Sequence, residues 1–161
     1  MYKLLLFILM LTVWLMLHTL QIDEEMAMAA LYQGKHAVNR AAHAAAQQLE
    51  KEALAEGRVR IDEIGAAAEA ARYLQWNLQL DAAGRPLPGT YWNSDVKIAV
   101  FEVINDDRPF PYTYRNAAYN YEVTLQRPGV IMIIKLTYPR VFTMIEPIEW
   151  EIKGASELTA S

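Results

Sequence analysis

The chain has 161 residues, which leaves room for a membrane anchor and one small domain but not for two full domains. Its 15 basic and 19 acidic side chains nearly balance, so we expect no nucleic-acid partner, which would require a basic surface. With 53% hydrophobic residues, the chain is too apolar to be disordered. It contains no cysteine, which excludes disulfides, thiolate metal sites and cysteine nucleophiles.

An apolar run near the N-terminus predicts a membrane-spanning helix over residues 1–22, with membrane lipid as a partner. Residues 4–22 would form about 28 Å of helix, against a hydrocarbon core of about 30 Å. Lys3 precedes the run and three acids, at residues 23–25, follow it. By the positive-inside rule, we expect a single-pass protein with its N-terminus in the cytoplasm and residues 23–161 outside. The alternative is a cleaved secretory signal, with its cleavage site at residues 27–29.

Residues 23–56 are rich in strong helix formers and contain no proline and a single glycine, Gly34. This composition predicts that the membrane helix continues as an extracytoplasmic stalk and ends at Gly57, a residue suited to a helix C-cap. Residues 57–161 then form a small α+β extracytoplasmic domain. We expect it to open with a second helix over residues 61–80, followed by a loop rich in proline and glycine over residues 84–96.

After residue 96 the hydrophobic period changes to two, which is typical of strands. We expect strands over residues 98–104, 119–126, 130–138 and 148–153, with residues 105–116 as a loop. The run 130–138 is apolar on both faces, as in a central strand. The turn at Arg127-Pro128-Gly129 predicts a hairpin in which Glu122 lies opposite Lys135. The predicted fold class is α+β: a long N-terminal membrane-spanning helix, a second shorter helix and an antiparallel sheet of about four strands.

No pattern in the chain indicates an enzyme. The histidines, His18, His36 and His43, all fall on the first helix, and their spacing does not suit a metal site. There is no H-E-x-x-H, no G-x-S-x-G and no glycine-rich phosphate loop. Asp106-Asp107, beside Asn105 and Pro109, is better explained as turn chemistry. We therefore expect no catalytic residue, no metal and no cofactor.

Two sets of residues are candidates for binding a partner. Small residues on the first helix would form a ridge that lets another helix approach closely, with alanine's helix propensity as the plainer explanation. The ridge consists of Ala30, Gly34, Ala37, Ala41 and Ala45. Tyr112 and Tyr114, in the loop before the second strand, are the candidates for exposed binding aromatics. The plainer explanation for them is strand propensity and core packing.

A hydrophobic N-terminal helix that continues into an alanine-rich segment, topped by a small antiparallel domain, resembles type IV pilin-like proteins. The stretch VNRAAHAAAQQL, residues 38–49, is similar to the post-membrane segment of Tad (tight adherence) pseudopilins of the TadE/TadG type. The resemblance implies a pilin-like fold and a non-enzymatic structural or assembly role in a pilus-like or secretion-related cell-surface apparatus. Its partners would be other copies of the chain or subunits of that apparatus.

The chain departs from the pilin pattern near its N-terminus. Pilins carry a glutamate five residues into the mature segment, where this chain has Leu5, and no acid occurs before Asp23. We therefore expect an accessory component that stays in the membrane rather than a polymerising subunit. The alternative function is a membrane-tethered binding module for a glycan or an envelope protein.

Overall fold

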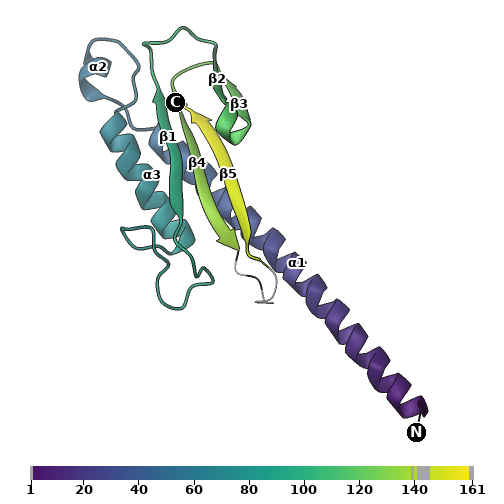
Figure 1. Ribbon diagram of the computed structural model, residues 1–161. Helices are drawn as coiled ribbons and strands as arrows, with labels where there is room; N and C mark the ends of the chain where they lie inside the picture. The colour runs from purple at the N-terminus through teal and green to yellow at the C-terminus, as the bar shows by residue number, and fades with distance from the viewer. Residues whose placement is uncertain (1, 139, 141–145, 160–161) are drawn as a thin grey trace.

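The computed structural model describes residues 2–138, 140 and 146–159. A long helix, α1 (Tyr2–Ala46), is followed by the short α2 (Lys51–Ala55) and by α3 (Glu63–Leu78). The rest of the described chain is β structure with one 3₁₀ turn (Figure 1): β1 (Lys97–Ile104), β2 (Tyr112–Asn116), η1 (Ala117–Tyr119), β3 (Tyr121–Leu125), β4 (Gly129–Tyr138) and β5 (Ile148–Glu157). The fold is therefore α+β, with a long N-terminal apolar helix, a shorter helix and antiparallel sheets, as predicted.

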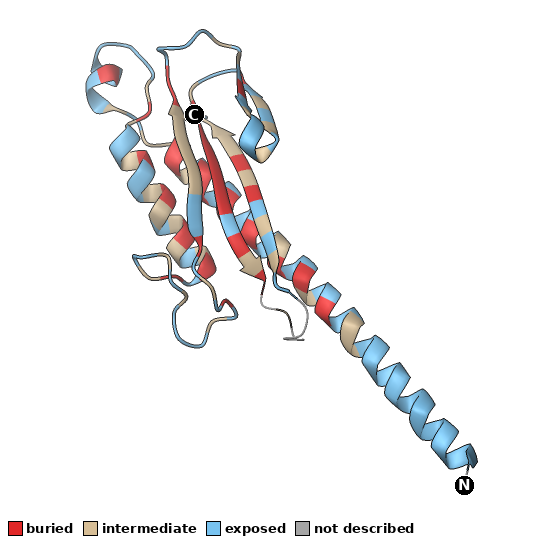
Figure 2. Cartoon of the chain, viewed as in Figure 1, coloured by how far each residue is buried: buried red, intermediate tan, exposed pale blue. Residues whose placement is uncertain are grey.

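Helix α1 has two parts with different surroundings. Residues 2–18 are exposed and project away from the rest of the chain (Figure 2), and this part is long and apolar enough to cross a membrane. From Asp23 onward one face of α1 is buried against α3, β4 and β5. Residues 23–46 thus pack against the domain, whereas the sequence predicted a stalk over residues 23–56 and a domain that begins at residue 57.

Tertiary contacts end α1 at Ala46, although residues 47–56 favour a helix by composition. Leu49 and Ile61 form an antiparallel bridge, and the backbone N–H of Glu50 donates to the carbonyl of Arg60 at 2.9 Å. The side chain of Asn105 pairs with Ile61, accepting from its N–H at 2.8 Å and donating to its carbonyl at 3.1 Å. Gly57 follows the end of a helix, as predicted, but that helix is α2 rather than α1. The φ angle of Gly57 is 77°.

A three-stranded antiparallel sheet, in the order β1–β4–β5, forms the centre of the domain. Strand β4 is central, as its two apolar faces predicted. One of its faces packs on α1 and α3, and the side chains that it buries there are Val130, Met132, Ile134, Leu136 and Tyr138. On the other face, Ile131 packs under the two-stranded β2–β3 hairpin. The domain therefore has three layers: helices, sheet and hairpin (Figure 1).

The predicted pairing of β3 with β4 is wrong. Strand β3 pairs with β2, so that Glu122 lies opposite Arg115, and Lys135 lies opposite Glu151 of β5. Alternation along a strand specifies which face is buried but not which strand is its neighbour, and β4 already has neighbours on both sides. Strand β2 falls in the expected loop, although Tyr112 and Tyr114 alternate with polar residues there. The described chain thus has five strands in two sheets, rather than about four in one.

Two glycines let α1 lie unusually close to the sheet. A Cβ atom added to Gly34 of α1 would lie 2.3 Å from Cδ1 of Ile152 and 2.9 Å from Cδ2 of Leu136. A Cβ added to Gly154 of β5 would lie 2.6 Å from Cγ1 of Val38. Neither glycine position has room for a Cβ atom without a shift of its neighbours. These two positions therefore help to determine how closely the helix and the sheet pack.

Candidate functional site

A polar cluster lies where the exposed apolar segment of α1 enters the domain. Asp23 is only 2% exposed, and the hydroxyl of Tyr138, at the end of β4, donates to its Oδ1 at 3.0 Å and to its backbone carbonyl at 3.1 Å. Arg140 places Nη1 3.4 Å from Oδ2 of the same carboxylate. These contacts attach α1 to the sheet directly after its exposed apolar segment.

The electrostatics of this cluster keep the Tyr138 hydroxyl protonated. Burial raises its pKa above the ordinary value, and hydrogen bonding with Tyr91 and Asp23 raises it further. The protonated hydroxyl is the form that can donate to a carboxylate. In the sequence, Asp23 is the first of three acids that follow the apolar run. Glu24 and Glu25 are exposed, whereas Asp23 lies seven residues before Ala30 and therefore on the same face of α1 as the ridge, which is the signal in the sequence that could have identified it.

The small residues of the predicted ridge are all buried within the chain's own fold. Gly34 faces side chains of β4 and β5, as its close contacts show. On the α3 side of α1, the Gln33 side chain donates to the backbone carbonyl of Asn77 at 3.4 Å. Arg40 donates to the side-chain Oδ1 of Asn77 at 2.8 Å. The four alanines, Ala30, Ala37, Ala41 and Ala45, are at most 3% exposed. In this structure the ridge packs against α3 and the sheet of the same chain.

The structure corrects the expectation that Tyr112 and Tyr114 are exposed. Tyr114 is 5% exposed and packs with Ile131 between the hairpin and the sheet, because β2 covers that face of β4. Burial raises the pKa of its hydroxyl, which donates to Glu102 at 3.0 Å. Tyr112 is half-buried against the same cluster. Core packing therefore accounts for both rings.

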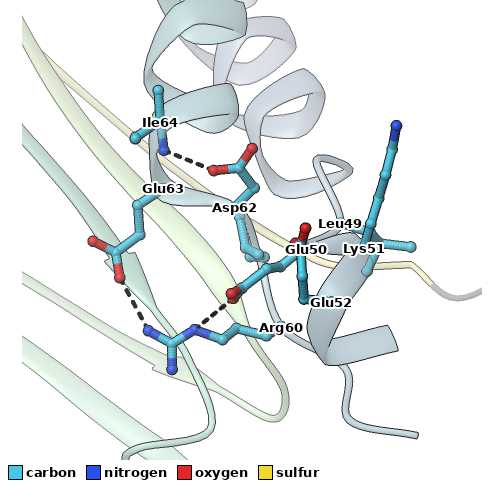
Figure 3. A pocket seen from close by; sticks show the side chains of 9 residues that line it. Leu49, Glu50, Lys51, Glu52, Arg60, Asp62, Glu63 and Ile64 are labelled. Atoms are coloured by element: carbon cyan, nitrogen blue, oxygen red, sulfur yellow. Dashed lines mark hydrogen bonds and ion pairs between the residues drawn. The ribbon is translucent and has the colours of Figure 1, made fainter. Parts of the chain in front are cut away.

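A groove of about 580 Å³ lies at the end of the domain opposite the apolar helix, between residues 49–52 and 60–64 (Figure 3). Its central basic side chain, Arg60, is paired with acidic neighbours. The Arg60 guanidinium lies 2.9 Å from Glu50 and 3.4 Å from both Glu63 and Asp106. Asp62 caps α3 by accepting from the N–H of Ile64 at 3.0 Å. This arrangement is typical of an ion-pair network that holds two chain segments together, and it contains no nucleophile with an adjacent base.

Within the described part of the chain, no group of three or more His, Asp or Glu side chains could hold a metal ion. His36 and His43 are exposed on α1, and Nδ1 of His43 lies 3.3 Å from the Ser156 hydroxyl. The cluster around Asp23 lies next to the exposed apolar segment of α1. No family model, curated protein or solved structure matches this chain.

Proposed function

We propose that this protein is a membrane-anchored, non-enzymatic structural or assembly component of a pilus-like or secretion-related cell-surface apparatus. Residues 4–22 span the membrane, the N-terminus lies in the cytoplasm, and the α+β domain lies outside. The similarity of residues 38–49 to Tad pseudopilins supports this assignment. The absence of a glutamate near the N-terminus favours an accessory role over polymerisation.

The observation that carries the proposal is the continuity of α1. A single helix of 45 residues supplies both the exposed apolar segment and the helix on which the domain is built. The helix is continuous between these parts, and Asp23 is buried where its contacts with the domain begin. A catalytic or ligand-binding domain can work on a flexible tether, whereas a rigid connection transmits position and force between membrane and domain. Such a connection suits an element of a scaffold.

The contact surface of such a scaffold would be the exposed part of α1, because the small-residue ridge is occupied within the chain. Leu9, in the membrane segment, is 58% exposed, whereas Ala41, on the ridge, is completely buried. We expect contacts between copies, or with apparatus subunits, to involve the exposed apolar segment around Leu9. Helices in a bilayer associate through side-chain packing rather than hydrophobic burial, so an all-apolar surface can serve.

Cysteine cross-linking in membranes tests this proposal, since the chain has no native cysteine. We expect Leu9→Cys to form disulfide-linked species under mild oxidation, either dimers or a product with a second protein. Ala41→Cys is the control and should not cross-link, because its side chain is buried. A chain that stays monomeric with every exposed α1 cysteine, and whose domain retains a glycan or an envelope protein, would instead support the binding-module alternative.

A further inference from the structure

An exposed stripe of large and polar side chains runs along α1, across the end of its apolar segment. Its members recur at alternating intervals of four and three residues, the spacing that puts side chains on one face of a helix. They are all exposed, and they are Trp14, His18, Gln21, Glu25, Met28 and Tyr32. None of them is among the residues of α1 that are buried against α3 and the sheet, so this outer stripe faces away from the domain.

Two members of the outer stripe are polar side chains within the apolar run of residues 4–22. The other polar side chains of the run, Thr12 and Thr19, are satisfied within the helix, since each hydroxyl donates to a backbone carbonyl of α1 at 2.8 Å. Among the described residues, neither His18 nor Gln21 has a hydrogen-bond or ion-pair partner. A polar side chain in a membrane segment is costly against lipid, and it usually faces another protein segment.

The chemistry of these two side chains suits a second copy of the same chain. A neutral imidazole and a primary amide each carry both a donor and an acceptor, so each can pair with its own counterpart. The ring of His18 is stacked on Trp14, with centroids 5.5 Å apart and planes 4° apart, which keeps it on the stripe. Two α1 helices anchored in one membrane in the same orientation are parallel. In such a pair His18 meets His18, and Gln21 meets Gln21, at equal depth.

The outer stripe also carries large apolar side chains beyond the apolar run. Met28 and Tyr32 follow Ile22 by six and ten residues, and they are 45% and 60% exposed. A second α1 would cover both, because alternating intervals of three and four residues are those of the a and d positions in two-stranded coiled coils. Glu25 is the one member that its own copy disfavours. It lies past the apolar run, where water and salt weaken repulsion between like charges.

We propose that the outer stripe is the contact face of a parallel dimer, in which α1 of one copy packs against α1 of a second copy over residues 14–32. The inference rests on the membrane anchoring and orientation proposed above. The two domains lie on opposite sides of the helix pair, because each packs on the side of its α1 away from the stripe. Leu9 is nine residues from His18, or about two and a half turns, so it faces away from the stripe and stays open to other subunits.

Cysteines at two adjacent acids test the dimer, since the chain has no native cysteine. Glu24 and Glu25 are both exposed, but successive side chains point about 100° apart on a helix, and only Glu25 belongs to the stripe. In membranes that contain the full chain, we expect Glu25→Cys to form a disulfide-linked homodimer under mild oxidation. Glu24→Cys is the matched control, because it also removes one exposed acid, and it should remain monomeric.

A second change tests the polar pairing within the membrane. Gln21→Leu, introduced into the Glu25→Cys chain, should weaken dimerisation about tenfold, or about 1.4 kcal/mol, as expected for a hydrogen bond between membrane helices. Thr19→Val is its control, because the Thr19 hydroxyl already bonds within its own helix, and it should leave the dimer unchanged. The cross-linked fraction gives the dimer constant as the purified chains are diluted with phosphatidylcholine in vesicles.

Equal cross-linking of the Glu24 and Glu25 variants, none through Glu25, or a product of Glu25→Cys with a different protein would overturn the dimer. So would a dimer whose strength Gln21→Leu leaves unchanged. Leu9→Cys separates this failure from failure of the proposed function. A chain that cross-links through Leu9 but not through Glu25 contradicts only the dimer, whereas a chain released from membranes by alkaline carbonate contradicts both proposals.

Discussion

Replacing Gly34 by alanine tests whether the close approach of α1 to the sheet determines the packing of the domain. The new Cβ would lie 2.3 Å from Cδ1 of Ile152 and 2.9 Å from Cδ2 of Leu136, and both of these side chains are buried. In an exposed helix, the same change would stabilise by about 1 kcal/mol. Overpacking a well-packed core costs about 1–3 kcal/mol. We therefore expect a net destabilisation of about 0–2 kcal/mol.

A double-mutant cycle isolates the steric contribution. Ile152→Val removes the Cδ1 atom that the new Cβ would meet, and alone it should cost about 0.5–1.5 kcal/mol. In that background, we expect Gly34→Ala to be neutral or slightly stabilising, with a coupling energy of about 1–2 kcal/mol. Ile104→Val is the control, because Ile104 is buried on the hairpin side of the sheet. There the two changes should be additive.

Thermal unfolding of the full chain in mild detergent provides the measurement. For a chain of this size, 1 kcal/mol shifts the melting temperature by about 2–4 °C. The reasoning is refuted if Gly34→Ala raises the melting temperature of the native chain, since helix propensity alone would then explain the site. It is also refuted if the cycle with Ile152→Val is additive within about 0.5 kcal/mol.

Two further predictions concern buried polar contacts. Asn105→Ala leaves the backbone N–H and carbonyl of Ile61 buried without their partner, which should cost at least about 1–3 kcal/mol in guanidinium unfolding. An unchanged guanidinium midpoint would contradict the conclusion that the Asn105 amide holds the backbone of Ile61 in place. Tyr138 has a raised pKa in the folded chain, so its contribution to stability is complete below pH 10.0, the ordinary value for tyrosine, and is lost as the pH rises above it. The native free energy of unfolding should fall in this range by up to about 1.4 kcal/mol per pH unit more than that of Tyr138→Phe, and equal slopes in the two proteins would contradict the burial of the Tyr138 hydroxyl.

Local patterns in the sequence were sufficient for the element types and for the central strand. The apolar run of residues 4–22 predicts a long apolar helix. Residues 130–138, which are apolar on both faces apart from Lys135 and Thr137, predict a central strand. Both signals arise within one element, because hydrophobic periodicity reflects how that element meets its surroundings. Helix α3 was predicted within two residues at each end, because Asp62 caps its start and the chain after Leu80 no longer favours a helix.

Contacts between distant segments decided the rest, and no local pattern encodes them. Helix α1 ends at Ala46 because residues 48–50 pair with residues 60–62, which Asn105 holds from the end of β1. The alanine ridge is covered by α3 and the sheet of its own chain, although the same spacing would suit another copy. Strand β3 pairs with β2 because both sides of β4 are taken. Asp23 becomes a buried anchor only because Tyr138, 115 residues later in the chain, reaches it. A sequence specifies which surfaces need to be covered, whereas the partner that covers each surface is selected by the packing of the whole chain.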